Sequence, residues 1–167
     1  SITVDVPLRS YNSVVICGQV CNKKMILEFA QGVDTIATEQ NFYRSKKLEF
    51  AGRIRFLNLP AKNWEGVILD AGIKREICAN TIGFLANRER LAGYGIPPKR
   101  GVLLVGEPGT GKTLVCKALM AEAQGITCIL AHAYALGEDE YITELYELAQ
   151  DLSPSIVFIE DIDLITQ

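Results

Sequence analysis

The stretch from Gly106 to Thr113 reads GEPGTGKT, and it constrains the fold of this chain more than any other feature. It matches the pattern G-x-x-x-x-G-K-[ST] in full, with glycines where a loop must wrap closely around an anion. Backbone N–H groups in such a loop, together with the positive end of a following helix, bind phosphate oxygens. The apolar run GVLLVG, residues 101–106, precedes the loop and is typical of a buried parallel strand. The stretch therefore predicts a phosphate-binding loop between a strand and a helix.

The residue types in the loop predict a division of tasks. We expect Lys112 to reach the outer phosphates of a nucleotide, and the hydroxyl of Thr113 to be a ligand of Mg²⁺. The predicted nucleotide-contacting residues of the loop are Glu107, Pro108, Gly109, Thr110, Gly111, Lys112, Thr113 and Leu114.

A second motif, SIVFIEDID, follows about forty residues later. The apolar run predicts a buried strand over 155–160, and acids at the carboxyl end of such a strand point into the crevice where ligands bind in open α/β sheets. We expect Glu160 to hold the Mg²⁺ shell and Asp161 to orient and deprotonate the attacking water. Together with Lys112, these two acids are the predicted catalytic residues.

The elements around these motifs alternate in the order of a parallel α/β sheet. Helices are predicted over 73–91, 111–124 and 138–151, and strands over 101–106, 126–131 and 155–160. The predicted fold class is therefore α/β, with the parallel-sheet core of a P-loop nucleotide-binding protein.

The first part of the chain has a different pattern. Period-two alternation predicts strands over 13–20, 23–30, 46–52 and 53–59, and a helix fits within 31–42. The predicted domains are a small β-rich α+β module over 1–59, a linker and adenine-side segment over 60–72, and the first part of a nucleotide-binding domain over 73–167.

Residues 63–167 resemble the AAA ATPases. The resemblance lies in GIPPKRGVLLVGEPGTGKTLVCKAL and SPSIVFIEDIDLI, which are similar to the Walker A and Walker B motifs of that family, and in the entry segment WEGVILDAGIKREI. It is greatest for bacterial members with a small N-terminal domain and a Glu-Asp acid pair. The resemblance implies binding of ATP and ADP, Mg²⁺-dependent hydrolysis, and a homo-oligomeric ring, often a hexamer, that remodels a protein substrate. Because the entry segment lies against adenine in the family, we expect Ile68 and Leu69 to contact the base.

Three departures from the family pattern leave alternatives open. The acid pair is Glu160-Asp161 where the family usually has Asp-Glu. The segment after 126–131 is short, so a pore role for Tyr134 or Tyr141 competes with ordinary packing. The sequence stops soon after the acids, so we expect it to be the front part of a longer protein and to be inactive as an ATPase alone. Two alternatives to a protein-remodelling ATPase stay open. One is a nucleotide-dependent scaffold with little hydrolysis, and the other is a nucleic-acid-associated ATPase.

The composition bears on two questions: whether the protein binds nucleic acid or membranes, and in which cellular compartment it lies. Residues 1–100 contain 15 Lys and Arg against 9 Asp and Glu, but they are spread thinly, so solvated strand faces are favoured over a nucleic-acid surface. No apolar run approaches the roughly 18 residues of a membrane span. The odd number of 5 cysteines favours reduced thiols, and we expect a cytoplasmic protein.

Overall fold

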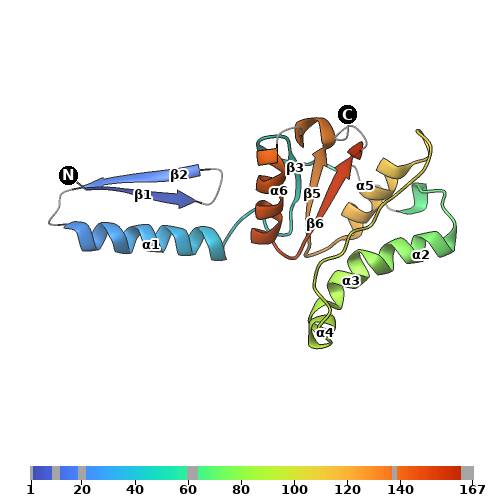
Figure 1. Cartoon of the computed structure of the whole chain (residues 1–167), viewed down its shortest axis with the longest axis horizontal. Coiled ribbons are helices and arrows are strands. Elements are labelled where there is room, and N and C mark those ends of the chain that lie inside the picture. Colours follow the sequence, from blue (N-terminus) through green and yellow to red (C-terminus); the bar gives the residue numbers. More distant parts are fainter. Residues whose placement is uncertain (1, 9–11, 19–21, 60–63, 137–138, 163–167) are drawn as a thin grey trace.

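The computed structural model describes residues 2–8, 12–18, 22–59, 64–136 and 139–162. Figure 1 shows a hairpin and a long helix on one side, and a second sheet between helices on the other. The strands are β1 Ile2–Leu8, β2 Asn12–Gly18, β3 Lys47–Phe50, β4 Ile54–Phe56, β5 Thr127–His132 and β6 Ser155–Glu160. The helices are α1 Lys23–Glu39, α2 Ala71–Asn80, α3 Ile82–Ala86, α4 Arg88–Gly93, α5 Lys112–Glu122 and α6 Asp139–Asp151, with short 3₁₀ turns at Trp64–Gly66 and Ala133–Leu136.

The N-terminal elements are an antiparallel hairpin, β1 with β2, and the helix α1 that packs along it. The strand predicted over 13–20 is confirmed as β2, but the strand predicted over 23–30 is wrong, because these residues begin α1. The buried side chains Ile26 and Ala30 explain the difference. They lie four positions apart, about one helical turn, and Glu28 between them is exposed, whereas a strand would place all three on one face.

The second sheet has the order β4-β3-β5-β6 and is mostly parallel. Strands β3, β5 and β6 run parallel, and β4 pairs antiparallel with β3. The strands predicted over 126–131 and 155–160 are thus confirmed, and so are the helices predicted over 111–124 and 138–151. The α/β class with a parallel-sheet core is correct.

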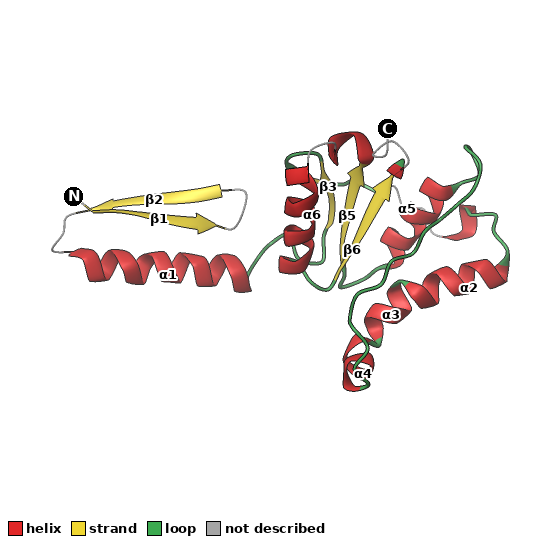
Figure 2. Ribbon diagram, viewed as in Figure 1, coloured by secondary structure: helices red, strands yellow, loops and turns green. Residues whose placement is uncertain are grey.

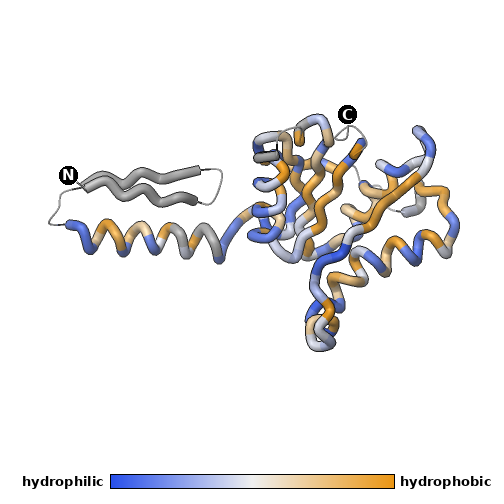
Figure 3. Tube along the Cα trace, in the orientation of Figure 1, coloured by the Kyte–Doolittle hydropathy of each residue, from blue (hydrophilic) through white to orange (hydrophobic). Residues whose placement is uncertain are grey.

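The two faces of this sheet pack against different helices (Figures 1 and 2). On β5, Cys128 and Leu130 pack with α5, whereas Ile129 and Ala131 pack with α6. This alternation follows the pleat of a strand, and β5 and β6 are apolar along most of their length, as Figure 3 shows. The P-loop helix therefore covers one face alone, which is called the α5 face below.

The hairpin β3–β4 belongs to the same sheet as β5 and β6. Leu48 and Phe50 of β3 are fully buried with the residues of α6, and Lys47 donates hydrogen bonds to the carbonyl oxygens of Ala123 and Ile126 beyond the end of α5. Residues 47–56 therefore lie in the same sheet as β5 and β6, although the sequence pattern groups them with residues 1–46.

The strand predicted over 101–106 is not formed. This segment is extended without regular structure, and Leu103 and Val105 are 72% and 86% exposed. A strand needs a neighbour for its backbone N–H and C=O groups, and no strand of the described residues pairs with 101–106. The apolar sequence of 101–106 favours burial, but no strand in the described part of the chain pairs with it.

The helix predicted over 73–91 is divided into α2, α3 and α4. Asp70 caps α2, accepting hydrogen bonds from the backbone of Gly72 and Ile73. The breaks fall at Thr81, whose hydroxyl donates to the carbonyl oxygen of Ile77, and at Asn87, whose amide donates to that of Gly83. Side chains that bond to a preceding carbonyl compete with the helical pattern. None of the helices in the described ranges is long and apolar enough to cross a lipid bilayer.

Candidate active site

The loop before α5 turns on two glycines in the left-handed region. Gly109 has a φ of 80° and Gly111 has a φ of 93°, and α5 begins at the next residue, Lys112. A side chain at either position would be strained, whereas glycine adopts this backbone freely. The loop therefore leads directly to the positive N-terminal end of α5, which is the arrangement that phosphate needs.

The ammonium group of Lys112 lies over the loop that precedes it. Its Nζ donates to the carbonyl oxygens of Gly106 and Glu107 at 2.6 and 2.9 Å. The hydroxyl of Thr110 donates to the same Glu107 oxygen at 2.7 Å, which closes a turn within the loop. These contacts hold a positive charge at the mouth of the loop, where it can meet an outer phosphate.

The remaining residues predicted to contact the nucleotide are neighbours of Lys112 in sequence, and they differ in exposure to solvent. Thr113 is exposed in the first turn of α5, and Leu114 beside it is half-buried. Glu107, Pro108, Gly109 and Thr110 are exposed. The Thr113 hydroxyl is thus accessible to a metal ion at the start of the helix.

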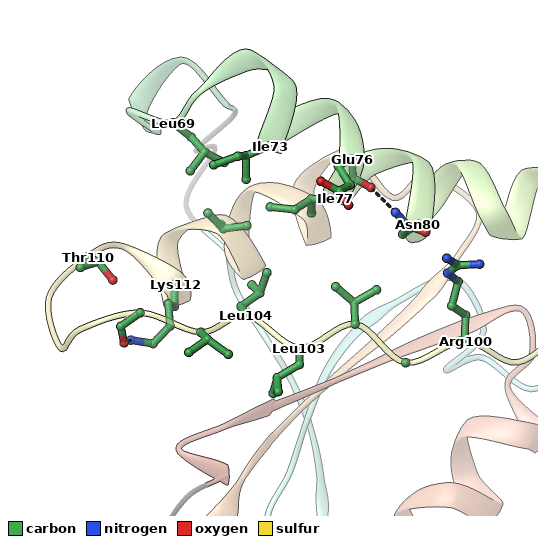
Figure 4. A pocket seen from close by; sticks show the side chains of 15 residues that line it. Leu69, Ile73, Glu76, Ile77, Asn80, Arg100, Leu103, Leu104, Thr110 and Lys112 are labelled. Carbon is green, nitrogen blue, oxygen red and sulfur yellow. Dashed lines mark hydrogen bonds between the residues drawn. The ribbon is translucent and has the colours of Figure 1, made fainter.

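A cavity of about 570 Å³ lies beside the loop, between α2 and residues 100–106 (Figure 4). Thr110 and Lys112 lie at one end of it and Arg100 at the other, as Figure 4 shows. Its apolar wall includes Leu69 and side chains of α2 and of the 101–106 segment. A polar end beside an apolar wall suits a ligand with both a phosphate and a flat ring.

The two residues predicted to contact adenine differ in position. Leu69 lines the cavity, directly before the capped start of α2. Ile68 is fully exposed and is not part of the lining. The cavity brings Leu69 together with Lys112 and Thr110, but not Ile68.

The acids at the end of β6 have contrasting surroundings. Glu160 ends the strand, and its Oε1 is buried without a hydrogen-bond partner among the described residues. Asp161 is exposed, and its φ of 57° turns the chain at the strand end. Carboxylate oxygens suit Mg²⁺, so the buried unpaired oxygen of Glu160 fits a place in the shell of that ion.

The thiol of Cys116 shows that Glu160 faces α5. Burial, and next the negative charge of Glu160, raise the pKa of Cys116 to about 11. Cys116 lies one turn after Thr113 on α5, so Glu160 acts on the same helix that carries the Thr113 hydroxyl. The described residues contain no group of three or more His, Cys, Asp and Glu placed to hold a metal ion, so Glu160 and Thr113 would share Mg²⁺ with phosphate oxygens and water.

Two polar residues that the sequence did not indicate lie beside Glu160. His132 ends β5 next to it, with Nδ1 at 3.7 Å from Glu160 Oε2. Glu49 of β3 lies on the other side of the imidazole, with Oε1 at 3.6 Å from Nε2. The position of His132 at the end of a predicted neighbouring strand could have indicated it, but the pairing of β3 with β5 has no signal in the local pattern.

The comparisons with known proteins match the region of these motifs. Residues 102–167 match the model of the AAA family, the ATPases associated with various cellular activities. The chain is 42% identical over 87 residues to the 26S proteasome regulatory subunit 4 homolog B of Arabidopsis thaliana, which covers 48% of this chain and 19% of that protein. It is 45% identical over 86 residues to the proteasome-activating nucleotidase of Sulfurisphaera tokodaii, covering 48% of this chain and 22% of that protein.

A third relative is the ATP-dependent zinc metalloprotease FtsH 3 of Sorangium cellulosum. It is 39% identical over 99 residues, which is 56% of this chain and 16% of the relative. The chain therefore matches about a fifth or less of the length of these proteins. With the loop, the cavity and the acids in place, residues 102–167 of this chain belong to the AAA ATPase family.

Proposed function

We propose that this protein binds ATP with Mg²⁺ and hydrolyses it, and that it works as a homo-oligomeric ring, often hexameric in this family, to remodel a protein partner. The observations that carry the proposal are the glycine loop and the Lys112 ammonium at the start of α5, and the buried, unpartnered oxygen of Glu160, whose charge acts on Cys116 of the same helix. The ring and the protein partner are supported by the family match alone.

The proposed mechanism assigns a step to each group. The amides of the loop and Lys112 hold the phosphates, and Leu69 packs beside the base in the apolar part of the cavity. Thr113 and Glu160 would hold Mg²⁺, which would supply positive charge to neutralise the phosphates. Asp161 orients a water molecule and takes its proton.

Binding is tested by Lys112→Ala with Lys46→Ala as the matched control, because Lys46 is exposed and outside the cavity lining. Loss of a charge-assisted contact to phosphate is expected to weaken ATP binding by about tenfold or more, whereas the control keeps the wild-type affinity. Isothermal titration calorimetry measures both. Equal ATP affinity in wild type and Lys112→Ala would contradict the proposal.

A scaffold that responds to nucleotide but hydrolyses little is the second candidate. The order of the acids favours it: the longer acid, Glu160, is mostly buried and the shorter one, Asp161, is exposed. A carboxylate displaced by about 1 Å can cost on the order of a hundredfold in rate. ATP binding with a normal affinity and no turnover in the intact protein would select this candidate.

We propose that the partner is neither a nucleic acid nor a membrane. We also propose a cytoplasmic location. Two of the basic residues of the N-terminal half make intramolecular hydrogen bonds: Lys47 donates to carbonyl oxygens beyond the end of α5, and the exposed Arg44 donates to the carbonyl oxygen of Asp151. The odd number of 5 cysteines supports a reducing compartment. Turnover measured with and without DNA tests the first point, and the location of a fluorescent fusion tests the second.

A further inference from the structure

Three polar side chains form a row across the carboxyl ends of three neighbouring parallel strands. His132 of β5 pairs in register with Glu160 of β6, and Leu130 of β5 pairs with Glu49 of β3. Because side chains alternate along a strand, Leu130 and His132 point to the same side, and so do their partners. Leu130 packs with α5, so the row Glu49–His132–Glu160 lies on the α5 face, the face of the phosphate loop.

The imidazole of His132 is held between the two carboxylates. Its Nε2 is 3.6 Å from Glu49 Oε1 and its Nδ1 is 3.7 Å from Glu160 Oε2. Its ring also stacks on that of Tyr134, with centroids 5.4 Å apart and an angle of 15° between the planes. Whichever nitrogen carries a proton therefore faces a carboxylate oxygen, and the ring has little freedom to turn away.

Burial increases along the row toward the site. The side chains of Glu49, His132 and Glu160 are 31%, 22% and 16% exposed. One oxygen of Glu160 faces the imidazole, while the other is buried and has no partner among the described residues. His132 thus lies against Oε2, and Oε1 is the oxygen left for another ligand.

We propose that His132, itself oriented by Glu49, is a positioning residue that holds Glu160 in the orientation needed for Mg²⁺. This inference rests on the proposed function, since it assumes that Glu160 serves the metal. It adds that the hairpin β3–β4, which precedes the region matching the AAA family, is connected to the site through Glu49. A partner that orients a metal-binding carboxylate typically contributes 10- to 100-fold to metal affinity or activity.

The test measures the Mg²⁺ concentration that half-saturates binding of a fluorescent ATP analogue. His132→Phe keeps a ring beside Tyr134 but removes both nitrogens, and we expect it to raise this concentration about tenfold. His132→Gln keeps an N–H donor and should recover most of the loss. Glu49→Gln should shift the value in the same direction by a smaller factor, while Glu28→Gln, an exposed residue of α1, leaves it at the wild-type value.

A parallel titration in EDTA, without metal, distinguishes positioning from a general effect on the fold. Metal-free affinity for the analogue should be the same in wild type, His132→Phe and Glu49→Gln. An unchanged Mg²⁺ requirement in His132→Phe, or an equal loss of metal-free binding, overturns the positioning role. If His132→Phe does not fold, an unchanged Mg²⁺ requirement in both His132→Gln and Glu49→Gln overturns it.

The same series separates this inference from the proposed function. If wild type binds the analogue no better than Lys112→Ala does, the nucleotide site itself is wrong, and the inference is wrong with it. If binding depends on Lys112 but the half-saturating Mg²⁺ concentration is the same in wild type and the His132 variants, only the positioning role is wrong.

Discussion

Asp161 and Glu160 are adjacent in sequence, yet they differ in burial and in backbone conformation. Glu160 ends β6 with its carboxylate beside His132 on the α5 face, and one of its oxygens is buried. Asp161 is exposed, with a left-handed backbone that Asp tolerates better than most residues. This difference in burial is the basis for the proposed roles, Glu160 as a ligand of Mg²⁺ and Asp161 as the residue that contacts the attacking water.

The two acids should therefore respond differently to loss of charge. In the intact protein, Asp161→Asn is expected to slow hydrolysis about a hundredfold or more while ATP stays bound, because an amide cannot take a proton from water. Glu160→Gln is expected to raise the Mg²⁺ requirement. Single-turnover phosphate release and Mg²⁺ titration measure the two effects. If Glu160→Gln instead trapped ATP with its metal affinity intact, the roles would be reversed.

The hairpin β3–β4 is the element whose role the structure changes most. Its strand β3 covers the edge of β5, so the backbone groups of β5 are paired on both sides. Lys47 adds a positive charge at the C-terminal end of α5, where the helix dipole is negative. The hairpin thus completes the core from outside the region that matches the AAA family.

Truncation of Phe50 tests this role. Phe50 is 0% exposed in the core beside α6, whereas Phe56 of β4 is 58% exposed and serves as the matched control. Phe50→Ala is expected to lower the free energy of unfolding by about 3–5 kcal/mol, because it leaves a cavity. Phe56→Ala should cost about 1 kcal/mol or less. Urea denaturation measures both, and similar small losses would mean that the hairpin is peripheral.

Sequence patterns predicted the elements that have local signals and missed those that depend on distant partners. The loop at 106–113, and β5, α6 and β6 after it, follow from glycine chemistry and apolar periodicity. The helix at 23–39 was partly predicted as a strand, because a short apolar run fits both periods. The pairing of Glu49 with His132 joins residues 83 positions apart, and no local signal encodes it.

At the scale of the whole molecule, the strands of the sheet are held by pairing and packing, whereas the segment before the loop has no strand partner among the described residues. The strands β3, β5 and β6 are paired in register and packed on both faces by α5 and α6. Residues 101–106 lead into the phosphate loop without a strand partner in the described residues. The acids are thus fixed by the sheet, whereas the loop is fixed mainly through α5 and its own hydrogen bonds.

The 167 residues alone are therefore expected to release phosphate slowly, even though the loop is formed. The reacting groups must be placed to within about 1 Å, and the unpaired segment before Gly106 gives no such control over the distance from the loop to Asp161. Charge on the transferred phosphoryl group also needs a positive group beyond Lys112, an effect of about 10³–10⁵ in rate where an arginine supplies it. The other basic residue of the cavity, Arg100, lies at the opposite end from Lys112, and residues 101–167 contain only Lys117 besides Lys112. A steady-state phosphate-release assay, with Lys112→Ala as the background, measures the rate. Turnover on the order of 1 s⁻¹ that Lys112→Ala abolishes would show that these residues position and neutralise the phosphoryl group unaided.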